Sequence, residues 1–417
     1  MKSLLCITIA VTLAFTSCTN ENRQPAEELE GWRLVEREVL GENLYGGPTL
    51  HGNTMYFTFI ENIRHGHGYG ENFTLWRRDL GENAWEKRPL FPEHQPGMSS
   101  LLPLDDSDLL FMYVNRVEEE NRRVHLVRVE EDTEIPLFEL GQERESGNPG
   151  VLNPRMDLMS DGNLHLLIPD RTDRFVRRFI VDPETGQEQR LSDIETPRVG
   201  ARIYGRLMEN DRLLVPLAVV NELLLLVIDL TDHSYEVHSL DTFTSKSNEP
   251  PRSISMYRLE NPDQYLVSYF RPAAFSDRSG RQGERTGLVG EVVLRVLETD
   301  SFETVESTVI AGFTPEKAST HNVPRTQVGP RDFLFAFTTV DRIHVRHLTG
   351  RYENYTGASM SRWHIRADGT PEIIFEEDLS PFYSASLQTM DDGKILFTYK
   401  DATSGASRIL DLMELVD

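Results

Sequence analysis

Short apolar runs alternate with turn-forming residues along almost the whole chain, and long stretches with helical periodicity are absent. Apolar residues at positions i, i+3 and i+4 would predict amphipathic helices. Runs of about four to eight residues rich in Val, Ile, Tyr and Phe, bounded by Gly, Pro, Asn and Asp, predict strands instead. The pattern therefore predicts an all-β protein.

One phrase recurs along the chain: a strand that ends in an acidic or Asn/Gly turn, followed by an apolar, aromatic-rich strand. Its seven copies lie 47 to 68 residues apart and begin at Gly47, Ser99, Pro154, Ala201, Ser253, His321 and Ser384. A propeller blade of four strands takes roughly 40 to 50 residues plus its loops. Each phrase would supply the two inner strands of a blade. Segments after it, such as "FTLWRRDL" and "EKRPLFP", would supply the third and fourth strands.

The seventh copy lacks a fourth strand, because only "ASRILDLMELVD" is left for the third. Before the first copy stands an unassigned strand, Gly31–Leu40. We predict that this strand completes the last blade and closes the ring, which removes two exposed sheet edges. The predicted fold is thus a seven-bladed β-propeller closed by an N-terminal strand. Six blades, or a pair of β-sandwich domains, are the alternatives.

The first residues predict an export signal. A basic Lys2 precedes an apolar run, Leu4–Phe15, that is too short for a transmembrane helix. "FTSC" is similar to the lipobox of bacterial lipoproteins, which implies cleavage before Cys18, lipidation of Cys18 and anchoring at the bacterial cell envelope. Plain secretion into the periplasm is the alternative. We expect residues 1–17 to be a signal peptide, residues 18–30 a polar tether and residues 31–417 a single propeller domain.

Charge narrows the choice of partner. The formal net charge of -24 disfavours a nucleic acid, because phosphate would be repelled over most of the surface. Of the 43 basic residues, all but six are arginines. Guanidinium groups suit carboxylate or sulfate ligands, although a compositional bias toward arginine explains their number equally well.

Several copies resemble a known family. "SSLLPLDDSDLLFMYVNR" and "SASLQTMDDGKILFTYKD" resemble the inner strands of sialidase-like, BNR-repeat propellers. "LWRRDLGENAWEKRPLF" resembles a degraded Asp-box, with Asp79, Gly81 and Trp85 in place and Arg77 where the family has serine. Asp-boxes are structural, so Asp79 is expected to be a turn residue. The resemblance implies the propeller fold and a carbohydrate-active relative, but the arginine triad and the tyrosine–glutamate pair of sialidases have no match. Related propeller-type polysaccharide lyases use histidine and tyrosine for proton transfer and arginine to neutralise a uronate.

Candidate site residues follow from the face on which propellers bind ligands, where the inner strands begin and where the second and third strands connect. The candidates for proton transfer are His321, His65, His67 and Tyr204, of which the second and third lie in "IRHGHGYGEN". The candidates for binding an acidic substrate are His51, Arg64, Arg155, Arg202, Arg271, Arg325 and Tyr352. Asp157 and Asp170 are the carboxylates expected nearest the pocket. A solvated hairpin loop and a polar channel lining are the alternatives.

These features predict an envelope-anchored propeller that acts on or binds an acidic polysaccharide or oligosaccharide. As an enzyme it would be a polysaccharide lyase, acting by β-elimination at a uronate, or a sialidase-like glycoside hydrolase. The alternative is a non-catalytic propeller that binds a glycan or a protein. Two histidines at i and i+2 could bind zinc, but no HExxH motif or cysteine supplies further ligands, so we expect no metal or cofactor. A structural divalent cation has no supporting motif. We expect a monomer that touches the membrane through its lipid anchor only.

Overall fold

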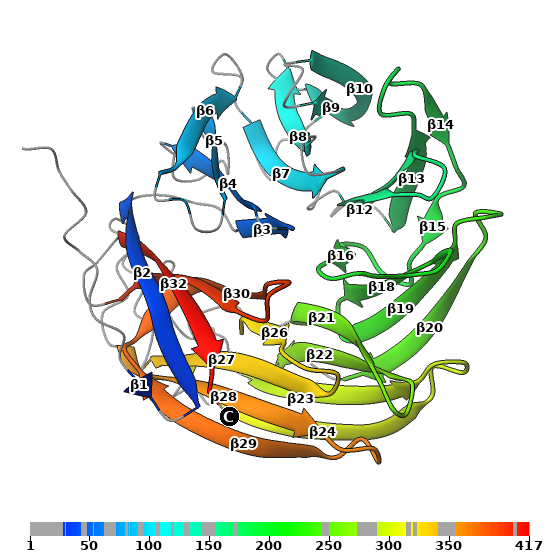
Figure 1. Cartoon of the computed structure of the whole chain (residues 1–417). Coiled ribbons are helices and arrows are strands. Elements are labelled where there is room, and N and C mark those ends of the chain that lie inside the picture. The colour runs from blue at the N-terminus through cyan, green and yellow to red at the C-terminus, as the bar shows by residue number, and fades with distance from the viewer. Residues whose placement is uncertain are drawn as a thin grey trace, which may run out of the picture.

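The structure is a computed structural model. It describes residues 28–29, 31–42, 48–52, 54–61, 72–79, 82, 84–90, 96–104, 109–117, 121–128, 133–142, 155–169, 174–243, 250–272, 290–313, 318–319, 323–340, 355–402 and 407–416. These residues form seven antiparallel sheets arranged in a ring (Figure 1). The predicted seven-bladed propeller is confirmed. Within the described part of the chain, no helix is both long enough and apolar enough to cross a membrane.

Blades 1 to 3 follow one another along the chain, each from its inner strand outward. Blade 1 consists of β3 (Pro48–His51), β4 (Thr54–Glu61), β5 (Asn72–Asp79) and β6 (Glu86–Leu90). Blade 2 consists of β7 (Pro96–Pro103), β8 (Leu109–Val117), β9 (Asn121–Arg128) and β10 (Thr133–Gln142). Blade 3 consists of β11 (Arg155–Leu158), β12 (Leu164–Pro169), β13 (Phe175–Val181), β14 (Glu188–Arg190) and β15 (Ile194–Glu195).

Blades 4 to 6 repeat this order, with the inner strand of two of them divided into short pieces. Blade 4 consists of β16 (Arg202–Ile203), β17 (Leu207–Glu209), β18 (Arg212–Val219), β19 (Glu222–Asp229) and β20 (Tyr235–Thr242). Blade 5 consists of β21 (Arg252–Leu259), β22 (Gln264–Pro272), β23 (Gly290–Glu298) and β24 (Thr304–Phe313). Blade 6 consists of β25 (Ala318–Ser319), β26 (Arg325–Gln327), β27 (Asp332–Val340), β28 (Tyr355–Ile365) and β29 (Pro371–Leu379).

Blade 7 joins the two ends of the chain. It consists of β30 (Phe382–Thr389), β31 (Ile395–Asp401), β32 (Ser407–Leu415), β2 (Trp32–Glu42) and β1 (Glu28–Leu29). The outer strand β2 runs antiparallel to β32, with Trp32 opposite Leu415 and Glu42 opposite Ser407. The predicted closure by an N-terminal strand is therefore confirmed. The unassigned strand of the sequence is the fourth strand of the last blade.

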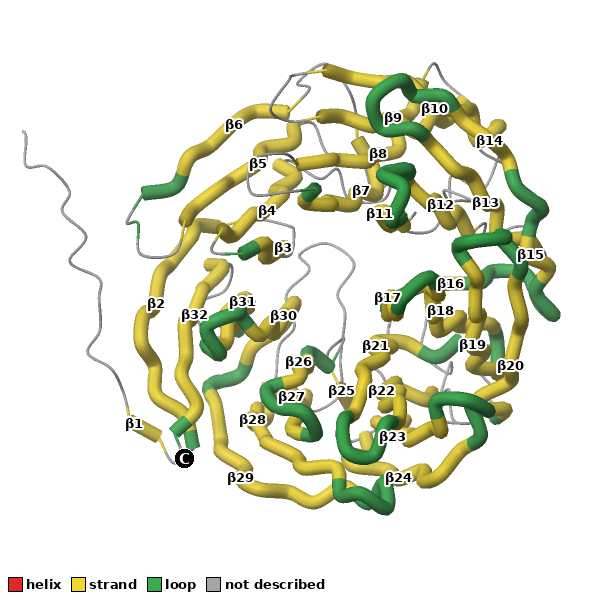
Figure 2. Tube along the Cα trace, turned by 45° about the vertical axis from the view of Figure 1, so that its right-hand side comes forward, coloured by secondary structure: helices red, strands yellow, loops and turns green. Residues whose placement is uncertain are grey.

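The position of a strand within its blade explains its sequence. The second and third strands are covered on both faces by neighbouring blades, so they are almost continuously apolar, as in "RLLVPLAV" of β18 and "ELLLLVID" of β19. The outermost strands have one face toward solvent and are more polar and more exposed, as in "PEIIFEEDL" of β29, none of whose residues is buried. Figure 2 shows this nesting of the strands from the centre to the rim.

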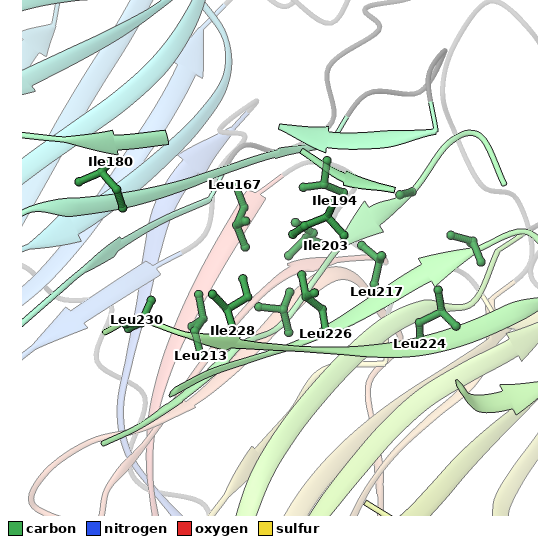
Figure 3. Close-up of a cluster of buried hydrophobic side chains, with 14 of the residues drawn as sticks. Leu167, Ile180, Ile194, Ile203, Leu213, Leu217, Leu224, Leu226, Ile228 and Leu230 are labelled. Atoms are coloured by element: carbon green, nitrogen blue, oxygen red, sulfur yellow. The ribbon is translucent and has the colours of Figure 1, made fainter. Parts of the chain in front are cut away.

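The hydrophobic core is divided among the seams between blades. Each seam holds one cluster of buried side chains from the two blades that meet there, and seven such clusters lie within the described residues. Figure 3 shows the cluster between blades 3 and 4, where Leu167 and Ile180 meet Leu213 and Ile228. The seam between blades 7 and 1 has its own cluster around Phe57. Packing is thus continuous around the ring, including the point of closure.

Candidate functional site

Arginine is the first residue of an inner strand in four successive blades. Blades 3 to 6 begin their inner strands, or the main part of them, with Arg155, Arg202, Arg252 and Arg325. The chain runs in the same direction in each inner strand, so these strand starts lie toward the same end of the ring. The repeat therefore concentrates guanidinium groups on one side of the channel, at the face predicted to bind ligands.

Strand register shows how far along its blade each of these arginines lies. Arg155 lies opposite Leu167, two residues before the end of β12, and Arg252 lies opposite Phe270, two residues before the end of β22. Arg202 is opposite the penultimate residue of β18. The three residues thus lie within one residue of the same level in blades 3, 4 and 5, and all three are half-buried.

Arg155 belongs to a buried charge network between blades 3 and 4. Its Nη2 donates a hydrogen bond of 2.9 Å to the carbonyl oxygen of Tyr204. Asp157, 2 % exposed, forms an ion pair with Arg206 from the segment between β16 and β17. Burial raises the pKa of Asp157, and the charges of Arg206 and then Arg155 oppose that rise. Burial, with the charge of Arg206, lowers the pKa of Arg155 to about 10, so its guanidinium remains protonated at neutral pH.

Arg202 forms no ion pair with a carboxylate of the described residues. Its Nη1 lies 3.4 Å from the hydroxyl oxygen of Tyr204, two residues further along the same inner segment. Tyr204 is itself held by packing against the cluster between blades 4 and 5. A half-buried guanidinium placed beside a phenol and without a carboxylate counter-charge can bind an anionic ligand.

Arg325 lies at a different depth and has different partners. It is 7 % exposed, and its Nε and Nη1 donate to the hydroxyls of Ser255 at 3.1 Å and Ser268 at 2.7 Å. The Tyr257 hydroxyl donates to the Arg325 carbonyl oxygen at 3.3 Å. Burial lowers the pKa of Arg325 to about 10. These contacts join blade 6 to blade 5, so the main role of the Arg325 side chain is structural: it connects two neighbouring blades.

Two further predicted residues do not begin an inner strand. Arg271 is on the second strand of blade 5, where it pairs with Glu291 at 2.6 Å and Asp241 at 3.5 Å across the seam with blade 4. His51 is the last residue of β3 rather than the first, and it faces Thr54 across the turn. It therefore lies at the opposite end of its inner strand from the arginine strand starts.

The remaining predicted residues lie outside the described part of the chain: Cys18, Arg64, His65, His67, Asp170, His321 and Tyr352. Arg206 was not among the predicted residues, although it shares one inner segment with Arg202 and Tyr204. The only sequence signal for it is a second arginine just after Gly205. A Cβ at that glycine would lie 3.0 Å from the carbonyl oxygen of Ile254, so the glycine permits a close approach to blade 5.

Among the described residues, no three His, Cys, Asp or Glu side chains come together as potential metal ligands. Asp79, predicted to be a turn residue, ends β5 and accepts a hydrogen bond of 2.5 Å from the Thr54 hydroxyl. Its carbonyl oxygen accepts a hydrogen bond from the Glu82 amide at 3.0 Å. These contacts give Asp79 a structural role in blade 1.

Comparisons with known proteins give one structural similarity and no match in sequence. No protein-family model matches the chain, and a search of curated proteins finds no match. Among solved structures, the chain is similar to the β-propeller domain of the Trilobed protease from Pyrococcus furiosus. The TM-score is 0.45 and the sequence identity 11%, over 91% of this chain and 97% of that one. The class of protein is that of the seven-bladed β-propellers, as its seven sheets define.

Proposed function

We propose that this propeller binds an acidic polysaccharide at the end of the ring where its inner strands begin. The observation that carries the proposal is the repeated arginine at these strand starts, above all Arg202, which has no carboxylate partner among the described residues. Arg155 and Arg252, at equivalent levels in the neighbouring blades, would flank it.

The chemistry of the group favours a glycan that carries carboxylates or sulfates. A guanidinium presents planar, paired N–H donors that match such groups better than an ammonium does. Tyr204 adds an aromatic ring, which can pack on the apolar face of a sugar. Because the arginines repeat from blade to blade, a polymer with repeated anionic groups could contact more than one of them.

Binding measured by calorimetry tests this proposal. We expect a uronic-acid polysaccharide to bind and a neutral polysaccharide of similar length not to bind. Arg202→Gln should weaken binding at least about tenfold, equivalent to about 1.4 kcal/mol. Arg190→Gln is the matched control, because Arg190 is an exposed residue on the rim that pairs with Asp193. Equal binding of neutral and acidic glycans, or unchanged binding by the Arg202 variant, would contradict the proposal.

A polysaccharide lyase is the second candidate function, supported by the contact between Arg202 Nη1 and the Tyr204 hydroxyl. β-Elimination at a uronate needs a cation on the carboxylate together with groups that remove and supply protons. Arg202 and Tyr204 would provide the cation and one proton-transfer group, and His321, His65 or His67 would provide the other. This is the chemistry that the resemblance to propeller-type lyases suggests.

Digestion of uronic-acid polysaccharides separates the possibilities. A lyase would release products with the ultraviolet absorbance of an unsaturated uronate, and Tyr204→Phe should abolish turnover while binding remains. A sialidase-like hydrolase would release reducing ends without this absorbance. Binding without either product would identify a non-catalytic glycan-binding propeller.

Anchoring at the bacterial envelope through a lipid on Cys18 is part of the same proposal. A lipoprotein would hold the binding face of a monomeric propeller near the outer membrane, within reach of polymeric substrates. Mass spectrometry of the processed N-terminus tests it, and Cys18→Ser should release the protein from the membrane fraction. A soluble wild-type protein processed at another residue would contradict it.

A further inference from the structure

The seam between blades 3 and 4 contains a second group of basic side chains, buried within the sheets. His165 on β12 and Arg178 on β13 have no solvent-exposed surface. In the strand register His165 faces Ile180 and Leu167 faces Arg178, so the two basic side chains leave the same face of the sheet as diagonal neighbours. This face packs on blade 4, because Leu167 and Ile180 belong to the cluster in Figure 3.

Blade 4 contributes His233 from the turn between β19 and β20. The carbonyl oxygen of His233 accepts a hydrogen bond of 2.9 Å from Arg178 Nη2. The guanidinium carbon of Arg178 also lies 5.5 Å from the ring centre of Tyr235 on β20. These two contacts fix the Arg178 side chain across the seam, between His165 of its own blade and the turn of the next.

Five nitrogen atoms of this group are buried and have no hydrogen-bond partner among the described residues. They are His165 Nδ1 and Nε2, Arg178 Nε and Nη1, and His233 Nδ1. Folded proteins pair the great majority of their buried polar atoms, because an unpaired buried donor loses its hydration without compensation. So many unpaired nitrogens around one guanidinium indicate a ligand that accepts hydrogen bonds.

The charge of Arg178 narrows the choice of ligand. Arg178 forms no ion pair with a carboxylate of the described residues, and a fully buried charge without a counter-charge is strongly unfavourable. A water molecule could accept a hydrogen bond but would leave the charge uncompensated. An anion does both. The ligand must also be small, because apolar side chains such as Leu167 and Ile180 surround the group.

We propose that His165, Arg178 and His233 bind a small monovalent inorganic anion of the chloride class between blades 3 and 4. Arg178 Nε and Nη1 donate to the anion and neutralise it. Burial lowers the pKa of His165 to about 3, so this imidazole is neutral at pH 7 and donates from the nitrogen that carries its proton. Because the anion binds residues of both blades in the folded state only, it stabilises the seam.

Thermal unfolding at constant ionic strength tests the proposal, with chloride replacing gluconate stepwise. We expect the unfolding temperature of the wild-type protein to rise by a few degrees and to saturate, and Arg178→Met to abolish the dependence. Arg190→Met, on the exposed edge of the same blade, is the control that should keep it. If the Arg178 variant does not fold, His165→Leu should show a reduced chloride response in its place.

Crystals grown or soaked in bromide give an independent readout. An anomalous peak within hydrogen-bond distance of Arg178 Nε and Nη1 would locate the anion directly. Ordered water at this position without an anomalous peak would overturn the proposal, as would the same chloride response in wild type, the Arg178 variant and the His165 variant. The outcome is independent of glycan binding, because this group comes from the second and third strands of blade 3 and the β19–β20 turn of blade 4, and includes none of the inner-strand arginines.

Discussion

The guanidinium of Arg78 on β5 donates a hydrogen bond of 2.6 Å to the carboxylate of Glu38 on β2. The indole nitrogen of Trp85 donates to the other oxygen of Glu38 at 2.9 Å, and the Arg78 guanidinium lies 4.7 Å from the Trp85 ring centre. β2 is therefore bound twice. Its backbone completes blade 7, and its side chains bind blade 1, so one strand joins the two blades at which the ring closes.

Glu38→Gln should destabilise the closure. Arg78 is 5 % exposed, and without the Glu38 charge its nearest remaining carboxylate oxygen is Glu36 Oε1 at 3.4 Å. We expect the free energy of unfolding in urea to fall by about 1–3 kcal/mol, the usual effect of weakening a charged hydrogen bond to a buried group. Arg33→Gln is the control on the same strand. Its pair with Glu414 is solvent-exposed, so a change of less than about 1 kcal/mol is expected. Equal losses in both variants would show that the contact with blade 1 adds nothing.

Closure could be predicted from the sequence because it is a matter of counting strands. The last copy of the repeat lacked a strand, and a spare strand stood before the first copy. The contact between Glu38 and Arg78 could not be predicted in this way. It depends on which face of β2 meets blade 1, and the two register shifts between β2 and β32 change that face along the strand.

Gly369 and Gly393 form a matched pair for testing contacts between blades. Both have a positive φ, +88° and +82°, so alanine is strained at either position. A Cβ at Gly369 would lie 2.9 Å from the Glu306 Cβ in blade 5, whereas nothing lies within 4 Å at Gly393. We expect Gly393→Ala to cost about 1 kcal/mol from backbone strain. Gly369→Ala should cost about 1–3 kcal/mol more, because blade 5 must shift. Calorimetric unfolding measures both, and equal values would mean that the turn of blade 6 can move away freely.

Lys400 should make stability depend on pH in the alkaline range. Burial, with the charge of Arg408 opposite it on β32, lowers its pKa from 10.5 to about 8. Between pH 8 and 10.5 the unfolded chain therefore binds more protons than the folded protein at this residue, so its contribution to stability rises with pH. The difference in unfolding free energy between wild type and Lys400→Met should shift in favour of wild type across this window.

Lys394, on the turn before β31, should show the opposite dependence of stability on pH. Its hydrogen bond to Asp392 raises its pKa, so its contribution is present below the unfolded pKa and is lost as pH rises above it. The advantage in unfolding free energy of wild type over Lys394→Met should thus decline at high pH. Curves of the same sign for both variants would contradict the assignment for Lys400.

The candidate site could be predicted in part. Arg155, Arg202 and Arg325 were found because each begins an inner strand, and that position follows from the repeat. Their partners come from other blades and could not be read from the sequence. Arg325 is bound to two serines of blade 5, whereas Arg202 contacts Tyr204 of its own inner segment. His51 was placed at the wrong end of its strand, although it directly precedes the Gly52 turn that ends the first strand of the repeat.

Asp157→Asn tests whether the charge network behind the channel arginines is truly buried. Asp157 is 2 % exposed and supplies the negative charge between Arg206, its ion-pair partner, and Arg155, whose pKa it helps to hold up. Asparagine keeps the shape but leaves two guanidinium groups without their counter-charge. We expect a loss of about 3 kcal/mol in urea unfolding, as when one partner of a buried pair is removed.

The same variant should bind an acidic polysaccharide more tightly, because Arg155 and Arg206, which lose their counter-charge, belong to the inner segments of blades 3 and 4. Glu372→Gln is the control for both measurements. Its pair with Arg366 is exposed and lies on the rim, so stability should change by less than about 1 kcal/mol and binding should not change. If Asp157→Asn lost no more stability than this control, the ion pair between Asp157 and Arg206 would be screened by solvent and not buried. Tighter binding without a loss of stability would place Asp157 at an open channel mouth, where its charge limits the affinity of the site for anions.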